Sequence, residues 1–448
     1  MSATPPRSPR MQGPIAPTKG PAKVAKLVKA DPKSVYPPKS PGPDATPSKP
    51  GTAGGAKLGP VGEAKKTGGL AAKVDSPTIV KHTKAVILDL GTGYLKAGFG
   101  GQPKPSCVIS STVGKPRQQS AKTGDNRQEA FVGKQLLGKP DLDLINPLKH
   151  GIVTDWDLVE SLWNYIFKKE LKIPSEEHAV MVSDPPLSPT TNREKFAEIM
   201  FENFSIPAMY IAYQSILSLY SYGRTTGIVV ESGHGVSYAV PIHDGYHLPN
   251  CTGRVDYAGD DLNKYLINLL KEGRQTFTDS SLNIVDDIKR KCCYIPLDIK
   301  YEMSLTPNDY TVDYELPDGH LITMGKERFR CPEALFRPNL LGSQEPGLHT
   351  LTMNSINKCD TDLKKDLLKN ILVCGGSTLF EGFPDRLQNE LAKIATNSKP
   401  IIVATPERKY SVWIGGSIMS SLKSFQQLWV QKKDYDEGGP FVIYRKCY

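Results

Sequence analysis

A short pattern that occurs twice constrains the fold of this chain more than any other feature. Residues 87–99, ILDLGTGYLKAGF, and residues 228–240, IVVESGHGVSYAV, each run from an apolar strand through an acidic residue to Gly-x-Gly and a second strand. Glycine accepts a positive φ, and without a Cβ its backbone N–H can approach an anion closely. One copy alone is typical of an ordinary hairpin turn. Two copies facing each other predict a clamp on a polyphosphate.

Short apolar strands alternate with amphipathic helices around these two hairpins. This alternation predicts an α/β body with ligand sites at strand ends. Thr191 and Glu194 have the spacing of a capping box, which predicts a helix start at that point. A third glycine-rich turn, CGGST at 374–378, follows another apolar strand. The pattern predicts a strand over 179–183, helices over 191–204, 261–270, 283–292 and 384–394, and a strand, turn and helix over 370–382.

The N-terminal segment differs in composition from the rest of the chain. Residues 1–80 carry 13 of the 56 Lys and Arg but 4 of the 47 Asp and Glu, so the remainder is balanced at 43 of each sign. The basic character therefore belongs to the tail, and it predicts no nucleic-acid groove on the body. Residues 1–82 also hold 15 of the 37 prolines, and we expect a disordered tail.

One stretch of this tail, PAKVAKLVKADP at 21–32, has lysines and apolar residues at helical spacing. Two interpretations remain: a short amphipathic helix that makes weak contact with an anionic surface or a partner, and a solvated tail. The second is favoured, because helices of so few turns seldom persist in water.

Cysteine content and hydropathy indicate a soluble protein of a reducing compartment. The eight cysteines form no metal-type CxxC pair, and eight in 448 residues do not make a disulfide framework. No apolar run approaches the roughly 20 residues that a transmembrane helix needs.

Longer stretches of the body resemble the actin family. These are DLGTGYLKAGFGG (89–101), HGIVTDWD (150–157), SLYSYGRTTGIV (218–229), ELPDGHLITMGKERFRCPEALF (315–336), PERKYSVWIGGSI (406–418) and the terminal YRKCY. The resemblance covers residues 84–448. The stretches at 176–195 and 231–237, together with KCCY, look more like the testis-specific actin-like protein seven group, which also has extended N-termini.

The resemblance implies two related α/β domains, divided into four subdomains, around a cleft that holds ATP or ADP with Mg²⁺ or Ca²⁺. Residues 83–214 with 411–448 match the small domain, and residues 215–410 match the large one. Asp89 matches the aspartate that holds the metal through waters, and Gln214 with Glu231 match the catalytic positions. The matched nucleotide contacts are Gly91, Thr92, Gly93, Lys96, Gly233, Gly235, Gly259, Lys289, Gly375, Gly376, Phe380 and Lys409.

Several side chains depart from actin's pattern. Glu231 replaces an aspartate, which moves the carboxylate by one methylene, and misplacement by roughly 1 Å weakens a base. Tyr238 replaces a histidine, and a phenol does not shuttle protons at neutral pH. His234 replaces a second aspartate, and Arg290 a ribose-binding glutamate. Phe380 stands where actin has an adenine-stacking tyrosine and still packs. We expect nucleotide binding with slow or absent hydrolysis.

Surfaces that match actin's contacts with its partners have changed unequally. Residues 117–131 match actin's DNase-binding loop. Where actin has apolar residues in that loop, this chain has Ala121, Lys122 and Asp125. Loss of buried Val or Met side chains predicts poor self-polymerisation. The segment matching the plug loop, 337–347, keeps two leucines but has Ser343 for a methionine. Tyr220, Gly245, Tyr246 and the C-terminal 413–422 match actin's groove for actin-binding proteins.

Three functions remain open at this stage. The first is a structural or scaffolding actin relative in the cytoplasm and cytoskeleton of male germ cells, in sperm-head shaping or acrosome attachment, with a nuclear location as an addition. The second is an active ATPase of the actin-like superfamily, such as a sugar kinase. The third is an actin-related subunit of a nuclear chromatin-remodelling complex, which the absence of body insertions disfavours. The expected partners are actin and actin-binding or other cytoskeletal proteins.

Overall fold

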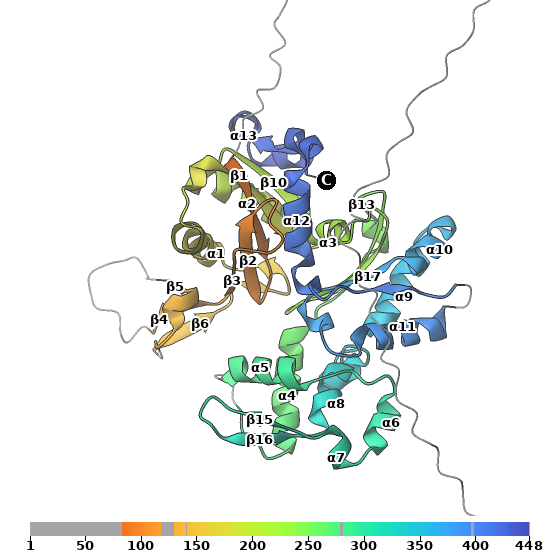
Figure 1. The fold of residues 1–448 in the computed structure, drawn as a ribbon. Helices are drawn as coiled ribbons and strands as arrows, with labels where there is room; N and C mark the ends of the chain where they lie inside the picture. Colours follow the sequence, from red (N-terminus) through yellow and green to blue (C-terminus); the bar gives the residue numbers. More distant parts are fainter. Residues whose placement is uncertain (1–82, 118–129, 140, 278–280, 396–397, 448) are drawn as a thin grey trace, which may run out of the picture. The chain divides into compact units, whose positions relative to one another are not determined.

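The two glycine hairpins begin two separate β-sheets in the computed structural model, which describes residues 83–117, 130–139, 141–277, 281–395 and 398–447 (Figure 1). In the first sheet the strand order is β19-β10-β9-β1-β2-β3. Strand β1 (Thr83–Leu90) is antiparallel to β2 (Tyr94–Phe99) and parallel to β9 (His178–Asp184). Strand β10 (Ala208–Tyr213) continues the parallel set, with β3 (Cys107–Ser110) and β19 (Val430–Gln431) at the edges.

The second sheet repeats this plan in the order β13-β12-β11-β17-β18, with β14 also paired to β12. Strand β11 (Gly227–Ser232) is antiparallel to β12 (Ser237–His243) and parallel to β17 (Ile371–Cys374). The smaller strands are β13 (Tyr246–His247), β14 (Gly253–Val255) and β18 (Ile402–Val403). A hairpin followed by parallel strands thus occurs twice, and this confirms the predicted α/β class with two related halves.

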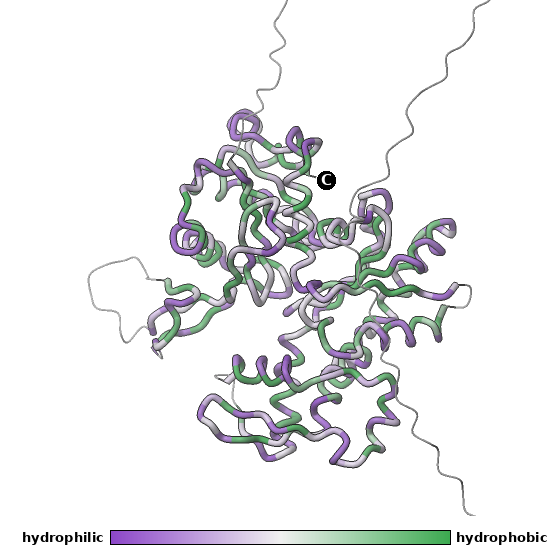
Figure 2. Tube along the Cα trace, in the orientation of Figure 1, coloured by the Kyte–Doolittle hydropathy of each residue, from purple (hydrophilic) through white to green (hydrophobic). Residues whose placement is uncertain are grey.

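Buried apolar residues explain why these strands form. The central strand β9 is buried along its whole length, as expected for a parallel strand covered on both faces. One cluster of buried residues gathers on the first sheet and a second gathers on the second sheet and its helices. Figure 2 shows the strands as mainly hydrophobic, whereas the helices alternate between hydrophobic and hydrophilic residues.

Helices α3 (Gln214–Ser221) and α12 (Ser411–Ser421) pack against each other unusually closely. A Cβ on Gly415 of α12 would lie 1.7 Å from the carbonyl oxygen of Leu217. Only glycine fits at this position, so the approach of the two helices depends on one residue.

The remaining helices cover the sheets or form a separate group with a hairpin. Helices α4, α5 and α8 lie together, and α5 also contacts the first strand of the β15–β16 hairpin (Figure 1). The other helices are α1 (Trp156–Tyr165), α2 (Thr190–Glu198), α4 (Gly259–Glu272), α5 (Leu282–Cys292), α6 (Ile299–Ser304), α7 (Pro307–Tyr310), α8 (Glu327–Glu333), α9 (Leu348–Lys358), α10 (Thr361–Lys369), α11 (Phe383–Ile394) and α13 (Lys432–Gly438). The short strands are β4 (Val113–Pro116), β5 (Phe131–Val132), β6 (Leu142–Ile145), β7 (Leu148–Lys149), β8 (Ile152–Val153), β15 (Val312–Glu315) and β16 (Leu321–Met324).

The predicted elements over 179–183, 261–270, 283–292 and 384–394 are confirmed. Of the strand, turn and helix predicted over 370–382, the strand is confirmed at Ile371–Cys374, but the turn carries only a short 3-10 helix over Gly376–Thr378 and the α-helix begins at Phe383. The predicted helix over 191–204 differs in two ways. It begins at Thr190, directly after Pro189, whose backbone is extended with a ψ of 136°, and no side chain caps it. Thr191 therefore lies inside the first turn and not at the cap, so the predicted capping box is wrong. Its regular part ends at Glu198 and a π-helix continues over Ile199–Asn203.

Some predictions concern residues that lie outside the ranges described by the structure. They are the tail over 1–82, its amphipathic stretch at 21–32 and most of the segment 117–131, including Ala121, Lys122 and Asp125. Among the helices that the structure does describe, none is both long and apolar enough to cross a membrane.

Candidate functional site

A cavity of about 480 Å³ lies where the turns of the two glycine hairpins meet. Its size is in the range of small-molecule sites in proteins. Every residue predicted to contact nucleotide or metal, or to act in catalysis, lines this cavity. They are Asp89, Gly91, Thr92, Gly93, Lys96, Gln214, Glu231, Gly233, Gly235, Gly259, Lys289, Gly375, Gly376, Phe380 and Lys409.

The two turns touch each other directly, and glycine makes this possible. A Cβ on Gly93 would lie 2.6 Å from Cγ of His234, and a Cβ on Gly235 would lie 2.7 Å from Cγ2 of Thr92. Two adjacent residues join the pair, because Nδ1 of His150 lies 2.7 Å from the carbonyl oxygen of Gly235 and the Gly151 N–H donates to the Thr92 hydroxyl at 2.9 Å. The repeated Gly-x-Gly pattern therefore serves the close approach of two turns.

Asp89 is the next-to-last residue of strand β1 and is almost fully buried. Its Oδ2 accepts a hydrogen bond from Nζ of Lys96 at 2.7 Å, and its Oδ1 accepts one from the Ser183 hydroxyl at 2.9 Å. The Ser183 oxygen in turn accepts from Nε2 of Gln214 at 3.2 Å. The predicted metal and catalytic residues are thus joined through a serine.

Glu231 and Tyr238 face each other across the second hairpin, as directly paired residues of β11 and β12. Burial raises the pKa of Glu231 to about 7, the Asp89 carboxylate adds to the rise, and Lys96 opposes it. Within the described chain, Oε2 of Glu231 and the Tyr238 hydroxyl are buried without a hydrogen-bond partner. Burial also raises the pKa of Tyr238, so its hydroxyl stays protonated at neutral pH.

His234 lies at the tip of the second turn. Burial lowers its pKa to about 4, the Lys289 charge contributes, and Asp260, whose Oδ1 lies 3.7 Å from Nε2, partly opposes the change. The imidazole is therefore neutral at physiological pH, and it brings no positive charge towards a bound cation.

Helix α5 supplies a second wall of the cavity. Lys289 donates to the carbonyl oxygen of Gly259 at 2.7 Å and lies 3.0 Å from Oδ1 of Asp286, while burial lowers the pKa of Lys289 to about 8. Arg290 makes an ion pair with Asp286 and a hydrogen bond to the Tyr94 hydroxyl, which itself donates to Oδ2 of Asp286 at 3.3 Å. We call Tyr94, Asp286 and Arg290 the cavity clasp, because they join strand β2 to helix α5.

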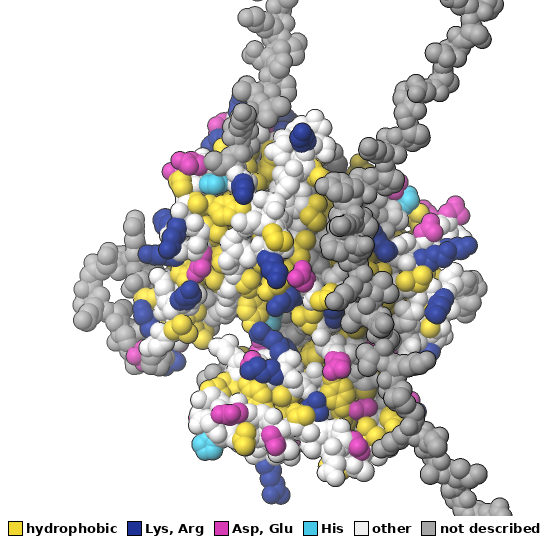
Figure 3. Space-filling model, viewed as in Figure 1, with side chains coloured by type: hydrophobic (Ala, Val, Ile, Leu, Met, Phe, Trp, Pro, Cys, Tyr) yellow, Lys and Arg dark blue, Asp and Glu magenta, His cyan; other side chains and the backbone are white. Residues whose placement is uncertain are grey.

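The charges around the cavity suit an anionic ligand. Six basic residues line it against four acidic ones, and Figure 3 shows Lys and Arg side chains gathered near the middle of this face. The basic residues are Lys96, Lys289, Arg290, Lys291, Arg408 and Lys409, and the acidic ones are Asp89, Glu231, Asp286 and Glu381.

The carboxylates also fit a divalent cation held largely by other oxygens. The Asp89 charge helps to raise the pKa of Glu231, and Oε2 of Glu231 has no partner among the described residues. Positive charge nearby relieves both conditions. No group of three or more His, Cys, Asp or Glu in the described chain is placed to hold a metal. A cation held here by Asp89 would take its other ligands from oxygens of water or of a bound ligand, a coordination that suits Mg²⁺.

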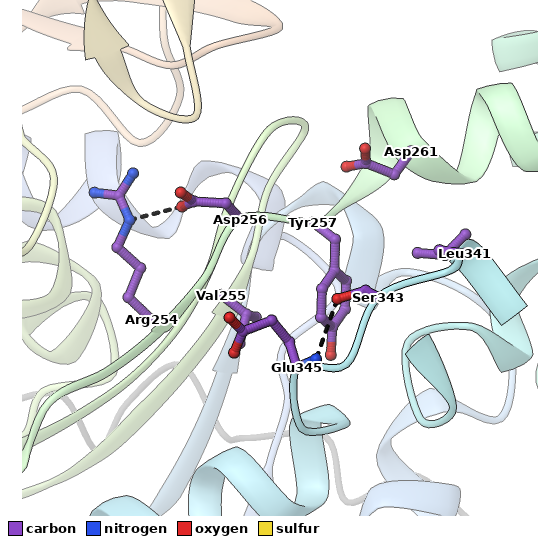
Figure 4. Close-up of a pocket in the computed structure, with 8 residues that line it drawn as sticks. All are labelled: Arg254, Val255, Asp256, Tyr257, Asp261, Leu341, Ser343 and Glu345. Carbon is purple, nitrogen blue, oxygen red and sulfur yellow. Dashed lines mark hydrogen bonds and ion pairs between the residues drawn. The ribbon is translucent and has the colours of Figure 1, made fainter. Parts of the chain in front are cut away.

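A second cavity, of about 360 Å³, lies apart from the predicted nucleotide residues (Figure 4). Arg254 makes an ion pair with Asp256 at 2.7 Å, and the Tyr257 hydroxyl donates to the carbonyl oxygen of Pro346. Its lining residues are Arg254, Val255, Asp256, Tyr257, Asp261, Leu341, Ser343 and Glu345. It therefore lies between β14, the start of α4 and the segment that matches the plug loop.

The predicted partner-groove residues come together elsewhere. A Cβ on Gly245, which has a φ of 85°, would lie 2.8 Å from the Tyr220 hydroxyl oxygen. Tyr246 follows at the start of β13 and is 60% exposed. Ile418 and Leu422, at the end of α12, are also exposed. Helix α3, which carries Tyr220, contacts both β13 and α12.

Ser183 and the clasp residues Tyr94 and Asp286 were not identified from the sequence as parts of the site. A signal for Ser183 existed, since it is a polar residue at the end of a fully apolar strand, where ligand sites are expected. The sequence contained no such signal for Asp286, because an acidic residue on an amphipathic helix is expected to face solvent.

Comparison with known proteins agrees with this architecture. The sequence model of the actin family, described as "Actin", matches residues 80–448. Actin-like protein 7A of Rattus norvegicus is 57% identical over 368 residues, which cover 82% of this chain and 83% of the relative. Actin-like protein 7A of Homo sapiens is 56% identical over 367 residues, with 82% and 84% covered. Actin-like protein 7B of Homo sapiens is 53% identical over 400 residues, with 89% and 96% covered. The chain is therefore a member of the actin family, similar to actin-like proteins 7A and 7B.

Proposed function

We propose that this actin-family protein is a structural or scaffolding part of the germ-cell cytoskeleton that binds ATP or ADP with Mg²⁺ or Ca²⁺ in its cavity. The observation that carries the proposal is the convergence of all fifteen predicted residues on one cavity with an excess of basic side chains. Backbone of the glycine turns and Lys96 bind the phosphates, Lys289 contacts the nucleoside, and Phe380 packs against the base. Asp89 would hold the cation through waters, and the cation would supply positive charge to neutralise the phosphates.

Denaturing the purified full-length protein and measuring the released adenine nucleotide tests this binding. We expect close to one nucleotide per chain, and a melting temperature that rises when ATP and Mg²⁺ are added. Replacing Lys96 with methionine should abolish both effects while Lys264→Met, on the exposed face of α4, leaves them intact. Absence of nucleotide together with an unmoved melting temperature would refute the proposal.

Hydrolysis is slow or absent in this proposal. The neutral, buried Tyr238 hydroxyl does not accept a proton, and Glu231 reaches the cavity with one more methylene than aspartate. Combining Tyr238→His with Glu231→Asp and His234→Asp should raise the rate of phosphate release. A wild-type rate equal to that of actin, measured in the same assay, would contradict this part.

One observation favours the second candidate function, an active ATPase. The pKa of Glu231 at about 7 is suited to a general base at neutral pH. The rate of phosphate release, measured for wild type and Glu231→Gln, distinguishes the two candidate functions. If the protein is an ATPase, the substitution abolishes a measurable rate; if it is a scaffold, both proteins release almost no phosphate.

The proposed scaffold acts through actin, actin-binding proteins or other cytoskeletal proteins in the cytoplasm, and it self-polymerises poorly. The cluster of Tyr220, Gly245, Tyr246 and the exposed end of α12 supports docking of an apolar helix. Tyr246→Asp should abolish capture of such partners from germ-cell extract, and Tyr301→Asp, an equally exposed tyrosine elsewhere, should not. Pelleting of the pure protein as long filaments would contradict poor self-polymerisation. Imaging of tagged protein distinguishes the cytoskeletal location from that of a nuclear remodelling subunit.

A further inference from the structure

We infer that Ser183 is a positioning residue: its hydroxyl fixes Asp89 and Gln214 relative to each other, and this strengthens binding of a divalent cation together with the nucleotide. The inference rests on the proposed function, since it concerns the same cavity. Ser183 itself does not line that cavity. It acts through the two residues that do.

The sheet places Ser183 between its two partners. Strand β9, which carries Ser183, lies between β1 and β10, and all three run parallel. Their carboxyl ends therefore meet at one edge of the sheet, where Asp89 lies one residue before the end of β1 and Gln214 begins the helix after β10. Three segments that are far apart in the sequence thus present polar side chains at one place.

The hydrogen bonds are directed by the chemistry of the groups. An ionised carboxylate only accepts and an amide nitrogen only donates, so the Ser183 hydroxyl must donate to Asp89 and accept from Gln214. Ser183 and Asp89 are each 2% exposed, and Gln214 is 8% exposed. Ser183 itself is shielded from bulk water and does not line the cavity, so water does not readily replace its hydroxyl.

Asp89 is thereby held by both carboxylate oxygens. Lys96 binds Oδ2 and Ser183 binds Oδ1, which together fix the rotation of the carboxylate about its Cβ–Cγ bond. Without Ser183 one oxygen loses its donor, and the carboxylate is free to turn towards Lys96. Each oxygen keeps a further lone pair, so the fixed carboxylate can still accept from a cation's waters. Loss of the Ser183 hydroxyl should accordingly lower the affinity for nucleotide when a cation is bound and leave it unchanged without one.

The experiment measures the affinity of the full-length protein for ATP, with Mg²⁺ and with a chelator, in wild type and in Ser183→Ala. We expect affinity with Mg²⁺ to fall about tenfold, as for loss of one hydrogen bond to a charged group, and affinity with chelator to stay the same. Ser237→Ala is the matched control. Ser237 is equally buried, and its hydroxyl joins Ser232 and the Tyr257 carbonyl without lining the cavity.

A double-mutant cycle with Asp89→Asn separates positioning from general destabilisation. If Ser183 acts through Asp89, Ser183→Ala should cost little further affinity once Asp89 has lost its charge. Equal losses with Mg²⁺ and with chelator, or losses that add in the double variant, would overturn the inference while nucleotide binding stands. If wild type binds ATP under neither condition, the proposed function falls and this inference falls with it.

Discussion

Replacing Glu231 with glutamine removes a carboxyl group whose ionisation the fold opposes. The pKa of Glu231 is raised from 4.5 to about 7, first by burial and then by the charge of Asp89. The folded protein thus holds this proton more tightly than the unfolded chain does. Its contribution to stability is complete below pH 4.5 and is lost as the pH rises through 7. Glutamine has nearly the same shape and no proton to lose.

The magnitude follows from the two pKa values. Each pH unit between the two pKa values corresponds to about 1.4 kcal/mol. Above pH 7, ionisation of Glu231 therefore lowers the free energy of unfolding by up to roughly 3 kcal/mol. The value is an upper limit, since Glu231 borders the cavity. Relative to wild type, Glu231→Gln should gain stability steadily between pH 4.5 and 7 and then level off.

Urea unfolding of both proteins, followed from pH 5 to 8 with a chelator and without nucleotide, measures this difference. Comparing the two variants at each pH cancels the contributions of all other titrating groups. Glu381→Gln is the control, because that side chain is exposed at the rim of the same cavity. A stability difference between wild type and Glu231→Gln that stays constant over this range would refute the reasoning.

Three further changes test the clasp and the packing. Tyr94→Phe removes the hydroxyl of the cavity clasp, so the dissociation rate of a fluorescent ATP analogue should rise about fivefold. The control Tyr314→Phe loses a hydrogen bond to α5 away from the cavity and should not change this rate. Equal dissociation rates for wild type and Tyr94→Phe would show that the clasp does not retain nucleotide. Glu333→Gln breaks the buried two-bond pair with Arg386 and should cost roughly 3–5 kcal/mol in urea unfolding. Gly415→Ala puts a methyl group into the backbone of α3 and should lower the melting temperature by several degrees; an unchanged value would mean that the two helices separate freely.

Much of the candidate site could be predicted because its glycines and charged residues stand in short, specific patterns. The cavity is lined by the turns of both Gly-x-Gly hairpins, by Gly375, Gly376 and Ser377 of CGGST, and by Lys96, Lys289 and Lys409. The clasp escaped prediction because its members come from β2 and from α5, nearly 200 residues apart. The helix at 190–203 was predicted with the wrong start, because it follows Pro189 directly, two residues before the expected cap at Thr191.

Local patterns in the sequence by themselves determined the α/β class, the two related hairpins and the membership of the actin family. These depend on strand periodicity, on glycine at turns and on motifs of ten or more residues, all of which are contiguous in the chain. Only the tertiary structure decided how the hairpins meet, that Ser183 links Asp89 to Gln214, and that Glu231 titrates near neutral pH. Each of these depends on burial and on distances between segments that the sheet order brings together, and a linear sequence carries neither quantity.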